Sequence, residues 1–142
     1  MKITIYAKPY GYTGNEIYAA LRDRGIVAEF YDKDFICFML NEQNTDAELE
    51  ALKCALFSIP RKKEIKERAP TVSYMKMGCS PKEALMSEGE CIDTEDACGR
   101  IFASLSVSCP PAIPIAVCGE ILDEECILRM KYYGVQSVRV KK

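Results

Sequence analysis

The chain has 142 residues, of which 49% are hydrophobic and 28% charged, and its formal net charge at pH 7 is −2. These values are ordinary for a globular protein of one domain or two small ones, and they exclude the basic footprint of a nucleic-acid-binding protein. No apolar run approaches the ~18 residues of a membrane span, and the N-terminus is too short and polar for a signal peptide. We therefore expect a cytoplasmic protein without a nucleic-acid or membrane partner.

Eight cysteines and the absence of histidine restrict the chemistry that the chain can perform. The cysteines stand at positions 37, 54, 79, 91, 98, 109, 118 and 126, and no two of them form a CxxC pair. Zinc sites need clustered ligands, so we expect no metal, and no Ser/His or Cys/His catalytic pair is available. The cysteines are expected to be reduced core residues, although a thiol-based redox protein with one exposed reactive cysteine stays open.

The first 25 residues predict a strand followed by a helix. Residues 2–7 alternate between apolar and polar side chains, which is typical of a strand. Thr13-Gly14-Asn15-Glu16 is a capping box, in which a threonine hydroxyl and a glutamate carboxylate each accept a backbone N–H of the first helical turn. The helix is expected to end at Gly25, where a left-handed conformation is inexpensive.

Two more strands and a second helix complete the predicted first domain. Strands fit residues 26–31 and 35–40, joined as a short hairpin. A second capping box, Thr45-Asp46-Ala47-Glu48, opens a helix that ends before Pro60. The order predicts a two-layer βαββα domain over residues 1–60, with helices on a small antiparallel or mixed sheet.

Residues 61–70 are expected to be a charged linker between two domains. Residues 61–68 contain five basic and two acidic side chains, and Pro60 and Pro70 flank them. A basic patch for an anionic partner is an alternative interpretation, but a solvated segment is the commoner use of such a run.

The second domain, residues 71–142, is predicted to be an irregular α+β domain. Residues 71–75 are a possible strand, and Ser80-Pro81-Lys82-Glu83 is a third capping box that opens a short helix. Residues 90–92 are expected to be extended. Asp93 or Thr94 is expected to cap a further helix that runs through Phe102.

The end of the chain predicts a helix and a closing strand. The acidic run that begins at Asp123 suits a helix N-terminus, and Gly134 ends that helix. Residues 135–140 alternate as a strand. The predicted fold class is therefore α+β, a βαββα unit followed by an irregular unit.

A proline-rich apolar segment, Ser108-Cys109-Pro110-Pro111-Ala112-Ile113-Pro114, precedes this helix and continues to Glu120. Its prolines fix φ and remove backbone donors, so it cannot be a central strand. A stiff apolar segment of this kind is either a buried connector or the wall of a pocket.

Several motifs together resemble, in order and spacing, the C-terminal part of the ornithine/lysine/arginine decarboxylases, which are pyridoxal-phosphate (PLP) enzymes of fold type I. The motifs are Pro81-Lys82-Glu83-Ala84-Leu85, Gly99-Arg100-Ile101-Phe102-Ala103, Cys109-Pro110-Pro111-Ala112-Ile113-Pro114-Ile115 and Gly119-Glu120, preceded by Tyr12-Thr13-Gly14-Asn15-Glu16. The chain departs from the family at Cys109, Ala112 and Cys118, where the family has Tyr, Gly and Pro. Alanine lacks the conformational freedom of glycine, so we expect this segment to bend differently here.

The resemblance implies a part of a basic amino-acid decarboxylase that packs on the cofactor domain, in cis or in trans, and helps wall the active-site entrance. The family's His-Lys dipeptide, whose lysine binds PLP, has no counterpart here, because the chain contains no histidine. We therefore expect no catalytic or cofactor-binding residue in this chain and no activity of the chain alone. A homo-oligomer and a role in polyamine metabolism follow from the same resemblance. The alternative is a stand-alone, non-catalytic binding or regulatory module derived from that family.

The resemblance also nominates site residues. The substrate channel would be lined by Ser80, Glu83, Glu90, Cys109, Pro110, Pro111, Ala112, Pro114 and Glu120, and the domain interface would include Arg100 and Gly119. Each nomination has a structural alternative. Glu83 also fits as the third residue of a capping box, Glu90 as a surface charge, and Glu120 as a turn residue. Arg100 would pair either with the neighbouring domain or with the acidic residues 93–96.

Overall fold

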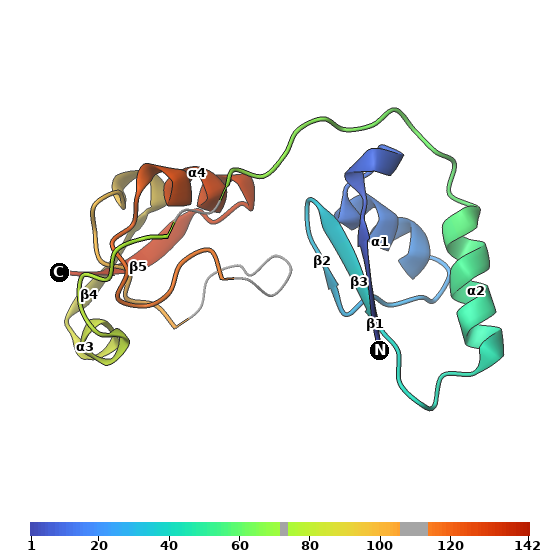
Figure 1. Cartoon of the computed structure of the whole chain (residues 1–142), viewed down its shortest axis with the longest axis horizontal. Helices are drawn as coiled ribbons and strands as arrows, with labels where there is room; N and C mark the ends of the chain where they lie inside the picture. The colour runs from blue at the N-terminus through green and yellow to red at the C-terminus, as the bar shows by residue number, and fades with distance from the viewer. Residues whose placement is uncertain (72–73, 106–113) are drawn as a thin grey trace. The chain divides into compact units, whose positions relative to one another are not determined.

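The structure is a computed structural model that describes residues 1–71, 74–105 and 114–142. The chain divides into two compact units, Met1–Arg68 and Ala69–Lys142 (Figure 1). The first contains a βαββα order of elements and the second mixes short helices, strands and irregular segments. The predicted α+β class is thus confirmed.

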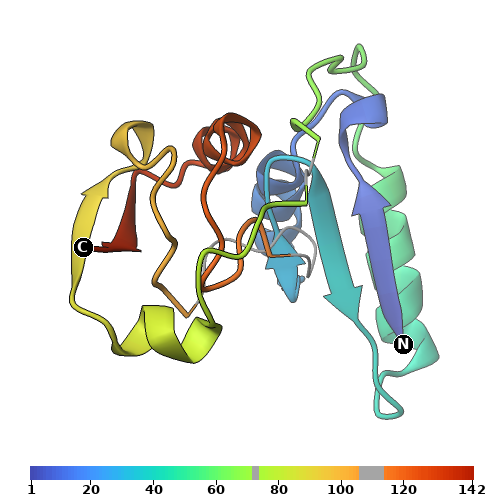
Figure 2. The same cartoon turned by 60° about the vertical axis from the view of Figure 1, so that its left-hand side comes forward.

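The first unit is a three-stranded antiparallel sheet with both α-helices on one face. The strand order is β1-β3-β2. The elements are β1 (Lys2–Tyr6), the 3-10 turn η1 (Lys8–Tyr10), α1 (Gly14–Arg22), β2 (Phe30–Tyr31), β3 (Phe35–Met39) and α2 (Asp46–Phe57). The core contains residues from β3, α1 and α2, among them Ile36, Phe38, Ile17, Leu21, Leu52 and Ala55. Figure 2 shows α2 running alongside β1.

Both capping boxes in this unit are confirmed. The Thr13 hydroxyl accepts the Glu16 N–H at 3.2 Å, and the Glu16 carboxylate accepts the Thr13 N–H at 2.7 Å. Thr45 and Glu48 repeat the arrangement at 3.3 and 2.8 Å. These backbone hydrogen bonds lower the pKa of Glu16 and of Glu48, because they favour the charged carboxylate.

The strand predicted over residues 26–31 forms only at Phe30–Tyr31. The Ile26 N–H bonds to the carbonyl of Leu21 and so closes the end of α1 instead of joining the sheet. The hairpin that follows is fixed by Asp32, whose Oδ1 accepts the N–H groups of Asp34 and Phe35 at 2.7 and 2.6 Å.

A buried ion pair joins the sheet of the first unit to the last residues of that unit. The Lys8 side chain is 1% exposed, and its Nζ lies 2.9 Å from Asp34 Oδ1. The same Nζ donates to the backbone carbonyl of Glu67 at 2.7 Å. Two backbone bonds, Lys62 N–H to Tyr10 O and Ile65 N–H to Lys8 O, run alongside. Residues 61–68, expected to belong to a linker, are therefore held within the first unit.

The second unit is built on a two-stranded antiparallel sheet. Its elements are α3 (Pro81–Met86), β4 (Gly89–Asp93), η2 (Thr94–Asp96), α4 (Glu124–Tyr132) and β5 (Ser137–Lys141). Strands β4 and β5 pair along their whole length. The core joins α4 and β5 to the irregular segments through Phe102, Ile115, Leu122, Ile127, Met130, Val138 and Val140.

The helix predicted from Asp93 or Thr94 to Phe102 is wrong. Only the short turn η2 forms, because the Thr94 hydroxyl donates to the carbonyl of Val135 instead of capping a helix. Gly99 is left-handed, at φ +78°, and the Phe102 N–H bonds to Glu120 O across the unit. Tertiary pairing has overridden the local helical pattern. The possible strand 71–75 is not formed at its described residues, and residues 72–73 lie outside the description.

The Lys8–Asp34 pair gives a test of this fold. Lys8→Met leaves a carboxylate buried without its cation, so we expect the free energy of unfolding to fall by about 3–5 kcal/mol. Urea denaturation followed by circular dichroism, with hydrogen exchange of the β1 and β3 amides, measures the loss. Lys33→Met is the control, because the Lys33–Glu67 pair is exposed and should contribute about 1 kcal/mol or less. Equal effects of the two substitutions would contradict the role of Lys8.

Candidate functional site

The proline-rich segment is described only from Pro114 onward. Cys109, Pro110, Pro111 and Ala112 lie outside the described residues. Pro114 is exposed, whereas Ile115 and Ala116 are buried in the core of the second unit. The described end of the segment thus combines a buried anchor with an exposed proline.

Ser80 and Glu83 stand at the start of α3. The Ser80 hydroxyl accepts the Glu83 N–H at 3.2 Å, so the N-cap is confirmed. The Glu83 carboxylate, however, accepts a hydrogen bond from Lys141 Nζ on β5 at 3.0 Å. Glu83 therefore ties α3 to the sheet instead of completing the reciprocal capping box.

Glu90 and Arg100 form an ion pair at the end of the β4–β5 sheet. Arg100 Nη2 lies 2.7 Å from Glu90 Oε1 and also donates to the Lys141 carbonyl at 3.0 Å. The two side chains are 36% and 39% exposed. Arg100 is thus paired within its own unit, and its described partner is Glu90 instead of the acidic residues 93–96.

Gly119 and Glu120 form a tight turn at the centre of the second unit. The Glu120 carboxylate accepts the Val117 N–H at 2.7 Å, and the Gly119 N–H bonds to the Phe102 carbonyl. Gly119 has φ +97°, and a Cβ there would lie 2.5 Å from the carbonyl oxygen of Cys79. Packing inside the unit therefore already accounts for a glycine at this position.

The structure brings Glu83, Glu90, Arg100 and Lys141 into one polar cluster beside β4 and β5. Sequence reasoning missed Lys141, which lies one residue beyond the predicted strand 135–140 and is the last residue of β5. The Glu83 hydrogen bond and charge raise the pKa of Lys141. The pairs are partly exposed, so each contributes about 0–1 kcal/mol to stability. The cluster can position or bind a charged group. Its amine, on Lys141, is paired with Glu83 and has a raised pKa, so it is held as the ammonium, which is not nucleophilic.

The deeply buried lysine of the described residues is not available to hold PLP. Lys8 is the deeply buried lysine among them, and its Nζ is committed to Asp34 and the Glu67 carbonyl. That commitment leaves it unsuited to bind a cofactor aldehyde. Across the described ranges, no three histidine, cysteine or acidic side chains gather as metal ligands, and no helix is long and apolar enough to cross a bilayer.

The described cysteines are all free, and they differ widely in environment. Cys54, Cys91 and Cys98 are exposed, whereas Cys37, Cys118 and Cys126 are buried. Burial, with the nearby Asp123 carboxylate as the next cause, raises the pKa of Cys126 to about 12. A redox thiol needs the opposite shift, so Cys126 is an inert core residue.

Comparison with known proteins finds relatives among the decarboxylases. No protein-family model matches the chain. The chain is 32% identical over 130 residues to the arginine decarboxylase of Halalkalibacterium halodurans, a match that covers 87% of this chain and 26% of that protein. It is 30% identical over 131 residues to the arginine decarboxylase of Bacillus anthracis, covering 87% and 27%. The chain is a partial-length relative of the decarboxylases. This confirms the resemblance that its motifs indicate.

The solved structure of the constitutive lysine decarboxylase of E. coli shares the fold of this decarboxylase relative. The TM-score is 0.64 at 18% sequence identity, and the match covers 99% of this chain and 31% of that one. The chain spans about a quarter of the length of the curated decarboxylases that it matches. About three quarters of each of those decarboxylases therefore lies outside the match to this chain.

Gly119 and Gly99 form a matched pair of left-handed glycines. Gly119→Ala should lower the free energy of unfolding by about 2–4 kcal/mol, because alanine disfavours this φ and its Cβ would also clash with the Cys79 carbonyl. Gly99 has a similar φ of +78°, but nothing lies within 4 Å of an added Cβ. Gly99→Ala should therefore lower the free energy of unfolding by only about 1 kcal/mol. Thermal and urea unfolding measure both. A Gly119→Ala variant as stable as Gly99→Ala would refute the packing constraint.

Cys126 predicts a loss of stability at high pH. Its pKa is higher when folded, at about 12, than the ordinary 9.0. The stability due to the neutral thiol is therefore fully present below pH 9 and is lost as pH rises towards 12. Between pH 8 and pH 10.5, urea midpoints should fall more for the native chain than for Cys126→Ala. Cys91→Ala, at an exposed site, should match the native slope, and parallel slopes for all three chains would contradict the assignment.

Proposed function

We propose that the chain is the C-terminal part of a cytoplasmic, PLP-dependent decarboxylase of a basic amino acid, ornithine, lysine or arginine. In this proposal it packs on the cofactor-binding domain and helps wall the entrance to the active site. The observation that carries the proposal is the 130-residue match to an arginine decarboxylase at 32% identity. The fold shared with a lysine decarboxylase supports it.

The chemistry would belong to the other part of the enzyme. PLP, held there, supplies the electron sink for decarboxylation. This chain would contribute shape and charge. The side chains of Glu83 and Glu90 are 58% and 39% exposed, and each is already oriented by a cation, Lys141 or Arg100. Pre-oriented carboxylates of this kind suit the terminal cation of a basic amino acid.

By its resemblance to the family, the proline-rich segment would contribute to the wall of the channel. Its described end has an exposed Pro114, followed by Ile115 and Ala116 buried in the core. Ser80 would hold the start of α3, and Glu120 would hold the turn that follows the wall. Both are positioning roles that require no reaction at the side chain.

One observation favours the stand-alone module instead. Each unit has a hydrophobic core of its own, which a free-standing protein needs. A module of this kind would bind a decarboxylase or another partner without restoring activity. The experiment below separates the two functions.

The test joins this chain to the part of a decarboxylase that lies outside the match. The full chain is co-expressed with the H. halodurans arginine decarboxylase from which the matched stretch has been deleted. We expect the two polypeptides to copurify and to decarboxylate arginine, lysine or ornithine when PLP is added, whereas this chain alone does not. Full-length H. halodurans enzyme is the positive control. Failure to copurify would refute the proposal, and copurification without activity would favour the module.

In the active complex of the two polypeptides, substitutions of the carboxylates test the proposed channel residues. Glu83→Gln and Glu90→Gln should each raise KM by about tenfold, the effect of losing one charged hydrogen bond, with little change in kcat. Their stability should change by about 1 kcal/mol or less, since both pairs are partly exposed. Glu88→Gln is the matched control, because Glu88 pairs with Lys142 on the surface and has no proposed part in binding. An unchanged KM in both test variants would remove these residues from the channel.

A further inference from the structure

We propose that the remainder of the decarboxylase docks on the outer face of the three-stranded sheet in the first unit. This inference rests on the proposed function and adds the surface through which it is exerted. The outer face consists of Lys2, Thr4, Tyr6, Phe30, Phe35, Cys37 and Met39.

The register of the sheet defines this face. Ile3 and Ile5 of β1 lie opposite Phe38 and Ile36 of β3 on the inner face, where α1 and α2 pack. The alternate pairs, Lys2 with Met39, Thr4 with Cys37 and Tyr6 with Phe35, therefore point to the outer face. Phe30 of β2 lies opposite Cys37 and joins them.

The central strand has the composition of a strand that is covered on both sides. β3 reads Phe-Ile-Cys-Phe-Met without a polar residue. Antiparallel strands with one solvated face alternate between apolar and polar residues, whereas strands buried on both faces are continuously apolar. Both α-helices of the unit lie on the inner face, so they leave the outer face of β3 without a helical cover.

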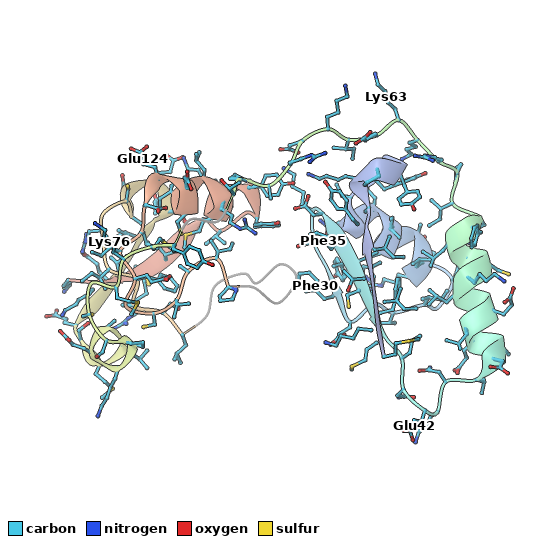
Figure 3. The ribbon with its side chains drawn as sticks, viewed as in Figure 1. Phe30, Phe35, Glu42, Lys63, Lys76 and Glu124 are labelled. Atoms are coloured by element: carbon cyan, nitrogen blue, oxygen red, sulfur yellow. The ribbon has the colours of Figure 1, made fainter. Side chains whose placement is uncertain are left out.

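The outer face has an apolar centre and a charged edge, which is the layout of a docking surface. The rings of Tyr6 and Phe35 lie 5.3 Å apart, and Thr4 donates to the sulfur of buried Cys37. Met39 is 61% exposed and Tyr6 36%. At one end, Lys2 pairs with Glu29 at 2.8 Å. Figure 3 shows Phe30 and Phe35 on the side of the sheet away from α2.

The area of the face and the unmatched part of the relative together indicate which polypeptide docks there. Strands β1 and β3 have five residues each and β2 has two. At about 4.8 Å between strands and about 3.4 Å per residue, the sheet covers roughly 200 Å². A stable dimer needs roughly 800 Å² from each partner, so this face is too small to hold a second copy by itself. Domain interfaces within one enzyme begin near roughly 300 Å² a side, of which this face would supply about two thirds. About three quarters of the H. halodurans enzyme lies outside the match, and that polypeptide is the occupant we assign.

Site-specific photo-crosslinking tests the assignment. A p-benzoylphenylalanine replaces Tyr6 on the outer face or, as the matched control, Phe57, which is 82% exposed at the end of α2. Each full-length variant is co-expressed with the truncated H. halodurans enzyme described above, and crosslinked peptides are identified by mass spectrometry. We expect crosslinks to the H. halodurans polypeptide from position 6 and not from position 57.

Charge substitutions supply a second measurement. The double variant Tyr6→Lys/Met39→Lys should weaken binding of the truncated enzyme by about tenfold or more, since two apolar contacts become charged. Phe57→Lys should change the affinity for the truncated enzyme by no more than about twofold. Circular dichroism checks that all variants remain folded.

The outcomes separate this inference from the proposed function. If the native chain copurifies but position 57 crosslinks and position 6 does not, the docking face is wrong and the function stands. Crosslinks from position 6 to a second copy, or to residues 69–142 of the same chain, also overturn the docking face. If the native chain does not copurify at all, the proposed function fails and this inference fails with it.

Discussion

The first unit depends on how a small sheet is covered. Two helices can bury only one face of three strands, and here the core residues of β3, Ile36 and Phe38, meet both helices on the same face. The buried Lys8–Asp34 pair closes the end of this layer and holds residues 61–68 against it. Apolar side chains are thus buried between the sheet and its two helices. The outer face of the sheet keeps exposed apolar side chains such as Met39.

The second unit depends on a close approach of backbone segments in place of regular layers. Gly119 allows the segment after the proline-rich stretch to pass against Cys79, and this contact sets where α3 lies. Ion pairs then join its surface segments: Glu83 of α3 pairs with Lys141 of β5, and Glu90 of β4 pairs with Arg100. The result is a scaffold in which each of these carboxylates is paired with a cation. The proposed role in substrate positioning would use this pairing.

The comparisons and the chemistry of the buried lysine agree with each other. The relatives are arginine decarboxylases of which the chain covers about a quarter, and Lys8 is committed to Asp34 and the Glu67 carbonyl. Cys126, with its raised pKa, is part of a core and not a reactive centre. A contribution of surface and charge to a catalytic body elsewhere reconciles both observations.

Local chemistry determined what the sequence could predict by itself. The boxes at Thr13 and Thr45 and the caps at Ser80 and Asp123 need only neighbouring residues, so the starts of the four α-helices in the described ranges were predictable. The α+β class and the decarboxylase resemblance were predictable as well. Tertiary contacts decided the rest. Phe102 bonds to Glu120 instead of extending a helix, and Glu83 reaches Lys141, 58 residues away. Contacts between distant segments leave no local pattern, which is why the polar cluster and the uncovered sheet face emerged only from the folded chain.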